Sequence, residues 1–93
     1  MGKYKIVLKP TAVKDLLKHK KSGNVATNKK IVAIFKELEN HPFTGIGNPE
    51  QLKYNFIGLW SRRLNQKDRI IYEVHENIVT VDVISALGHY SDK

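Results

Sequence analysis

The polar residues best suited to chemistry lie in the second half of the chain, beside a loop rich in proline and glycine and along the predicted strands that follow it. They are Glu50, Lys53, Arg62, Arg63, Arg69, His89 and Tyr90. Cleavage of RNA needs a group that deprotonates a 2′-hydroxyl, a group that stabilises charge on the attacked phosphate, and a group that protonates the departing 5′-oxygen. One carboxylate, one or two arginines and a histidine or tyrosine supply these functions, so the set points to RNA cleavage.

Each of these residues also has a structural explanation. Glu50 follows a proline and would be an ordinary solvated carboxylate in many proteins. Arg62 and Arg63 are adjacent, so in a strand they point to opposite faces and at most one of them belongs to a given site. Arg69 would then only fix a turn, and His89 would be an unconstrained residue near the chain end. Tyr90 would cover the rim of the core with its ring.

The sequence offers no ready set of metal or nucleotide ligands. Cysteine is absent, and there is neither a His-x-x-x-His pair nor a run of carboxylates. Gly45-x-Gly47 lacks the remainder of a dinucleotide fingerprint and is not followed by Gly-Lys-Ser/Thr. We therefore expect metal-independent chemistry with no cofactor.

Length and charge narrow the class of protein. The chain has 93 residues, which suits a single domain over residues 1–93. Sixteen Lys and Arg against nine Asp and Glu give a net charge of +7, and the resulting positive field attracts RNA, DNA or an acidic protein. The lack of cysteine and of a long apolar run leads us to expect a cytoplasmic protein that does not associate with membranes.

The first half of the chain predicts a strand followed by two helices. Residues 4–8 form a β-branched and aromatic run closed by Pro10, and Thr11 is the expected cap of a first helix that ends at Ser22-Gly23-Asn24. A second helix is expected over residues 25–40, because its apolar residues follow the spacing of one helical face. Those residues are Ile31, Ile34, Phe35 and Leu38.

The second half predicts an antiparallel meander. Residues 41–49 hold two prolines and two glycines and are expected to form an ordered loop. Strand-like runs follow at residues 54–64, 69–75 and 78–86, with Gly58 as an expected bend in the first. The expected fold is α+β: a strand, a helical hairpin, then the meander, with the helices packed on one face of a four- to five-stranded sheet.

Several separated motifs together resemble the YoeB/Txe family of the RelE/ParE toxin superfamily. The first runs from Pro42-Phe43-Thr44-Gly45 to Asn48-Pro49-Glu50-Gln51-Leu52-Lys53. It is followed by Gly58-Leu59-Trp60-Ser61-Arg62-Arg63, Asp68-Arg69-Ile70-Ile71-Tyr72 and the terminal His89-Tyr90. The resemblance covers somewhat over half of the chain and implies a RelE-like fold.

The resemblance also implies a function and a set of roles. It implies the toxin of a type II toxin–antitoxin system, a metal-independent endoribonuclease that cuts mRNA in the ribosomal decoding site, pairs with a YefM-type antitoxin and forms a homodimer. Glu50 would be the general base, His89 the general acid and Arg69 the group that holds the phosphate charge, while Tyr90 would orient or stack on the substrate. The expected substrate-binding residues are Arg63 and Lys53.

Two other functions compete with this expectation. One is a non-catalytic toxin of the ParE type, which poisons a topoisomerase by binding and need not retain the acid, arginine and histidine. The other is a small basic protein that binds nucleic acid or ribosomes through charge, for which the run Lys18-His19-Lys20-Lys21 would grip phosphates without sequence preference. Neither alternative produces cut RNA ends.

Overall fold

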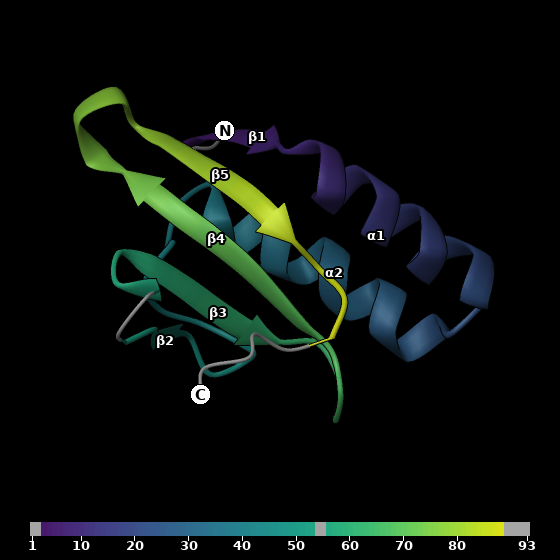
Figure 1. Ribbon diagram of the computed structural model, residues 1–93. Helices are drawn as coiled ribbons and strands as arrows, with labels where there is room; N and C mark the ends of the chain where they lie inside the picture. The colour runs from purple at the N-terminus through teal and green to yellow at the C-terminus, as the bar shows by residue number, and fades with distance from the viewer. Residues whose placement is uncertain (1–2, 54–55, 89–93) are drawn as a thin grey trace.

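A computed structural model describes residues 3–53 and 56–88 (Figure 1). In this part of the chain two helices pack against a mixed five-stranded sheet. The elements in chain order are β1 (Lys5–Leu8), α1 (Pro10–Ser22), α2 (Val25–Leu38), β2 (Glu50–Gln51), β3 (Leu59–Arg63), β4 (Arg69–His75), the 3-10 turn η2 (Glu76–Ile78) and β5 (Thr80–Ser85).

The sheet has the strand order β1-β5-β4-β3-β2, so the two ends of the fold lie side by side. Strands β2 to β5 pair antiparallel with their neighbours, as the short connections predicted, whereas β1 pairs parallel with β5. The sheet is therefore mixed, and the predicted α+β class with a helical hairpin and a meander is confirmed.

Apolar side chains of the helices and of one sheet face form the core. In β4, Ile70 and Tyr72 alternate with outward-facing residues, and Val81 and Val83 do the same in β5, because successive side chains of a strand point to opposite faces. Helices α1 and α2 cover that inner face (Figure 1). The core residues that they contribute are Ala12, Ile31, Ile34 and Leu38. On the opposite side of the sheet, which we call the open face, no helix packs within the described part of the chain.

The helix boundaries agree with the sequence except at the first cap. Helix α1 begins at Pro10 rather than after Thr11, and its N-cap is Lys9, whose side chain makes no capping hydrogen bond. The Thr11 cap was wrong because proline, which has no N–H to satisfy, suits the first helical position itself. Gly23 ends the helix in the left-handed conformation, and Asn24 caps α2 by accepting a hydrogen bond from the Thr27 N–H at 3.0 Å.

The strand boundaries required one correction. The run at residues 54–64 was expected to be extended, but the strand starts only at Leu59, and the preceding Gly58 has a φ of +95° that strand residues do not adopt. Positions 54 and 55 lie outside the described residues. Strand β4 has the predicted bounds, and β5 is slightly shorter than predicted. Among the described residues, neither helix has the length and apolar character needed to cross a membrane.

Candidate active site

Arg62 is a structural residue that organises the loop before Glu50. Its side chain is fully buried on the inner face and donates to Glu37 Oε1 at 2.6 Å and to the phenol oxygen of Tyr72 at 3.1 Å. It also donates to backbone carbonyls at residues 41, 44 and 46, at 2.6, 2.8 and 3.4 Å. The Tyr72 hydroxyl in turn donates to the carbonyl of Pro42 at 2.8 Å. The Arg62 guanidinium therefore provides hydrogen-bond donors for backbone carbonyls of the loop, which do not pair with a neighbouring strand.

The burial of this pair changes the acidity of Tyr72. Removal from water raises the pKa of the phenol above its ordinary value of 10.0, and the hydrogen bond and positive charge of Arg62 offset part of that rise. The phenol therefore stays protonated at neutral pH, and its proton makes the hydrogen bond to the loop.

Two glycines of the loop allow its backbone to approach these partners. Gly45 has a φ of +130°, and a Cβ at this position would collide with the carboxylate of Glu37. Gly47 has a φ of +83°, and its carbonyl accepts the N–H of Arg63 at 2.7 Å, which fastens the loop to the end of β3. These two glycines of the predicted ordered loop therefore allow the close contacts that hold the segment leading directly into β2.

Glu50 and Arg69 meet on the open face, although 19 residues separate them in the sequence. Arg69 Nη1 lies 3.3 Å from Glu50 Oε1 and 3.4 Å from Ser61 Oγ. The sheet register explains the meeting, because Ser61 of β3 lies opposite Glu50 of β2. The Glu50 side chain is 59% exposed and that of Arg69 is 25% exposed, so both are accessible from solvent.

Arg63 lies beside this pair, which decides between the two adjacent arginines. Its Cα is the register partner of Arg69 across β3 and β4, and its side chain is exposed, whereas that of Arg62 is buried on the other face. Strand parity thus assigns Arg63 to the open face, the same face on which the Arg69 guanidinium contacts the Glu50 carboxylate. Lys53 is exposed two residues beyond β2, with no contact to these side chains among those described.

Three buried polar side chains hold the chain just before His89. Asp15 Oδ2 accepts the N–H of Ala86 at 2.9 Å, and His19 Nε2 donates to the carbonyl of Ala86 at 2.6 Å. Asp68 Oδ1 accepts the N–H of Gly88 at 2.8 Å. We call Asp15, His19 and Asp68 the terminal clamp. His89 and Tyr90 themselves lie outside the described residues.

The clamp connects the chain end to Arg69. The N–H of Arg69 donates to the carbonyl of Gly88 at 2.8 Å, so the backbone next to His89 in the sequence is bonded to the residue that contacts Glu50.

The surroundings of Asp68 lower the pKa of its carboxyl group, although burial alone would raise it. The hydrogen bonds from Gly88 and Asn65 and the nearby positive charges of His19 and Lys67 outweigh burial and bring the pKa below 3.8. Asp68 is therefore an anion at neutral pH.

Comparison with known proteins identifies the family. The model of a family described as "YoeB-like toxin of bacterial type II toxin-antitoxin system" matches residues 8–90, which is most of the chain. The chain belongs to the YoeB-like toxins. Toxin YoeB of Synechocystis sp. is 40% identical over 62 residues, a stretch that covers 67% of this chain and 70% of the relative.

Solved structures of YoeB proteins share the fold over nearly the whole chain. The YoeB dimer of Staphylococcus aureus superimposes with a TM-score of 0.77 at 32% identity, over 95% of this chain and 99% of that one. YoeB in the heterotetrameric YoeB-YefM complex of the same organism gives a TM-score of 0.74 at 34% identity, over 94% and 98% of the two chains. The RelE-like fold expected from the sequence is therefore confirmed.

The terminal clamp of this YoeB-like toxin was not predicted from its sequence. Asp15 and His19 are four residues apart on α1 and so share one helical face, but the lysines around His19 make the segment read as a solvated surface. Both side chains are buried, and so is Asp68. The signal available in the sequence was the spacing of Ala12, Asp15 and His19 at three and four residues, which puts the polar pair on the buried side of the helix.

Proposed function

We propose that this YoeB-like toxin is a ribosome-dependent endoribonuclease that cleaves mRNA in the ribosomal decoding site by attack of the 2′-hydroxyl. The observation that carries the proposal is the contact between Glu50 and Arg69, with Arg63 beside it on an exposed face of the sheet. A carboxylate that accepts a proton, next to two guanidinium groups that bind phosphate, is what transesterification of RNA requires. A toxin that acts by binding alone has no need for this pairing.

The proposed reaction assigns each group a step. Glu50 accepts the proton of the 2′-hydroxyl, and the 2′-oxygen attacks the adjacent phosphorus. Arg69 and Arg63 stabilise the negative charge that builds on the phosphate oxygens. The bond from phosphorus to the 5′-oxygen breaks, and His89 donates a proton to that oxygen. The products are a 2′,3′-cyclic phosphate and a 5′-hydroxyl, and no metal takes part.

Substrate binding is the proposed role of the remaining predicted residues. Tyr90 would orient or stack on a base, and Lys53 would contact the RNA backbone. A positioned acid or base contributes about 100- to 10,000-fold to such a reaction, and one charge-stabilising donor contributes about 100- to 1,000-fold. Immobilisation of mRNA by the ribosome would supply further acceleration, because it removes the entropic cost of aligning the scissile bond.

The proposed partners follow from charge and from the relatives. A net charge of +7 favours binding to ribosomal and messenger RNA, and also to an acidic protein segment that folds over the basic surface. YoeB of Staphylococcus aureus is solved in complex with YefM and also as a dimer. We therefore propose a YefM-type antitoxin and a homodimer for this toxin. An enzyme that acts on translating ribosomes works in the cytoplasm.

The test is cleavage of a defined mRNA on purified ribosomes by the toxin and its variants. We expect Glu50→Gln, Arg69→Ala and His89→Gln each to lower the cleavage rate at saturating ribosomes by at least about 100-fold while ribosome binding changes little. Glu76→Gln, which removes an exposed carboxylate from the η2 turn, is the control and should cleave like the parent. Full activity of Arg69→Ala would remove Arg69 from the reaction, and a parent toxin that binds ribosomes without cutting would refute the proposal.

A further inference from the structure

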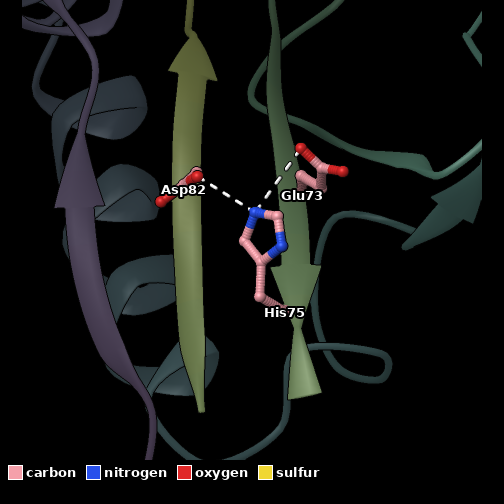
Figure 2. Close-up of side chains that lie close together, drawn as sticks. All are labelled: Glu73, His75 and Asp82. Atoms are coloured by element: carbon pink, nitrogen blue, oxygen red, sulfur yellow. Dashed lines mark hydrogen bonds and ion pairs between the residues drawn. The ribbon is translucent and has the colours of Figure 1, made fainter. Parts of the chain in front are cut away.

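A second group of polar side chains stands on the open face, at the other end of β4. Glu73 and His75 are two residues apart on β4 and so share a face, and Asp82 of β5 is the register partner of Glu73. Figure 2 shows the imidazole of His75 between the two carboxylates, with the helices on the far side of the sheet. The three side chains converge from two adjacent strands. The backbones of Glu73 and Asp82 are paired with a strand on each side, whereas His75 is paired only with Thr80 of β5.

The spacing of the three side chains is that of ligands around one metal ion. His75 Nε2 lies 3.0 Å from Asp82 Oδ2 and 3.6 Å from Glu73 Oε1, and one ligand atom from each residue lies within 4.8 Å of the others. In a tetrahedral zinc site with bonds of about 2.0 to 2.1 Å, neighbouring ligand atoms are about 3.3 Å apart. The two distances lie on either side of that value, and the two carboxylate oxygens lie within 4.8 Å of one another, so side-chain rotations that bring the carboxylates together would complete the geometry.

We propose that Glu73, His75 and Asp82 form a binding site for a divalent first-row transition-metal ion such as Zn²⁺. One nitrogen and two carboxylate oxygens favour such an ion over Mg²⁺ or Ca²⁺, which prefer oxygen ligands alone. Water would complete the coordination, since the side chains of Glu73, His75 and Asp82 remain 41%, 32% and 16% exposed. Two carboxylates and a neutral imidazole match the charge of a divalent cation.

Lys9 competes for this site. Its ammonium lies 3.7 Å from Asp82 Oδ2, the same oxygen that contacts His75, and its side chain is 49% exposed. A metal ion would have to displace this positive charge or share the carboxylate with it. Removing the charge with Lys9→Gln is therefore expected to strengthen metal binding at Asp82, whereas the affinity of an ion bound elsewhere on the protein would not change.

The site is separate from the proposed RNA chemistry. Glu73 and Arg69 lie on the same face of β4 but four residues apart, a distance of roughly 13 Å along an extended strand. A bound ion would join β4 to β5 close to the turn between them. We therefore expect ribosome-dependent cleavage to proceed with the site empty, whatever the outcome for the metal.

The test is calorimetric titration of Zn²⁺ into the full-length toxin after removal of trace metal. We expect one ion per chain to bind the parent, binding at least about tenfold weaker in His75→Ala and in Asp82→Asn, and tighter binding in Lys9→Gln. His41→Ala, which removes an exposed imidazole elsewhere in the chain, is the matched control and should bind like the parent.

Three experimental results would overturn the proposed metal site. The first is a parent and a His75→Ala variant that bind Zn²⁺ alike, which would assign the binding to other histidines. The second is a parent that binds no ion. The third is Lys9→Gln binding no better than the parent. Circular dichroism of each variant verifies that it is folded, and titration with Co²⁺, whose visible spectrum reports the number of ligands, checks that the ion is held by protein side chains.

Discussion

Glu50 and Arg69 form an ion pair, and in the proposed reaction this contact has to change when RNA binds. The distance of 3.3 Å and the exposure of Glu50 describe a surface ion pair, which contributes at most about 1 kcal/mol to folding. A phosphate placed between Arg63 and Arg69 therefore draws the guanidinium away from the carboxylate at little cost. Glu50 is then free to accept a proton. The weak ion pair therefore keeps the two proposed catalytic side chains close together but does not prevent them from separating.

The adjacent arginines of β3 are expected to behave in opposite ways. Arg62→Ala leaves the partly buried carboxylate of Glu37 and three loop carbonyls without their buried donor, which should lower the free energy of unfolding by about 3–5 kcal/mol. Arg63→Ala removes an exposed side chain and should change stability by less than about 0.5 kcal/mol while lowering cleavage. Urea unfolding and cleavage on ribosomes measure the two effects. Equal losses of stability would contradict the assignment.

Asp68 should make stability depend on pH in a defined window. Its pKa is lower in the folded protein than its ordinary value of 3.8, so the ionised side chain stabilises the fold above that pH, and the contribution is lost as pH falls through the folded value. Asp68→Asn places an amide donor where Asp68 accepts from both Gly88 and Asn65, and should cost about 1–3 kcal/mol at pH 7.

Unfolding of Asp68→Asn and of the parent by urea between pH 7 and pH 3 checks this expectation. The difference between the two proteins should be constant near neutrality and should shrink below pH 4. Glu76→Gln, whose carboxylate is exposed, is the control. A difference that does not change with pH would show that the charge of Asp68 adds nothing beyond its shape.

Among the elements, the helices were the easiest to predict and the segment after the loop the hardest. The period of Ile31, Ile34 and Leu38 fixed α2 because a helix must bury one face. The alternation in residues 69–75 fixed β4 for the same reason. The start of β3 was missed because the residues before Gly58 have strand-like types, whereas the described residues 56–58 form a turn in which the Phe56 N–H donates to the Lys53 carbonyl at 3.1 Å.

The candidate site was predictable in its residue types and only partly in its geometry. Strand parity separated Arg62 from Arg63, but which face meets the helices depends on the register of β3 with β4, which sequence does not reveal. Helical spacing placed Asp15 and His19 together, but their acceptor and donor, the backbone of Ala86, lies about 70 residues later in the chain, and no local pattern links the two. Long-range pairings of this kind decide where a chain end is held.

The terminal clamp is expected to act on the reaction as well as on stability. Asp15→Ala leaves the buried N–H of Ala86 without an acceptor, which should cost about 1–3 kcal/mol and loosen the segment that leads to His89. The cleavage rate at saturating ribosomes should therefore fall more than in Ile34→Val, a core variant that costs about 0.5–1.5 kcal/mol without touching the clamp. If both variants cleave at the rate of the parent while folded, the clamp has no part in positioning the chain end.

At the scale of the whole molecule, the residues that stabilise the fold and the residues proposed to act on RNA lie on opposite faces of the sheet. The inner face and the helices hold the apolar core, and the polar groups of chemical interest stand on the other side of the same strands. A chain of this size has one core, so functional residues have to be carried by strands that also support it. The composition predicts an attraction to polyanions, since a charge of +7 is a property of the sequence, whereas the proposed place of RNA cleavage follows from the fold.

The chemistry of the cut ends tests the proposed activity most directly. Purified toxin is added to ribosomes translating a defined mRNA, and the ends of the fragments are mapped with and without ribosomes. Attack by the 2′-hydroxyl predicts a 2′,3′-cyclic phosphate or 3′-phosphate on one fragment and a 5′-hydroxyl on the other, made only when ribosomes are present and unaffected by a chelator. Fragments that carry 3′-hydroxyl and 5′-phosphate ends, or cutting that stops when metal is removed, would contradict it.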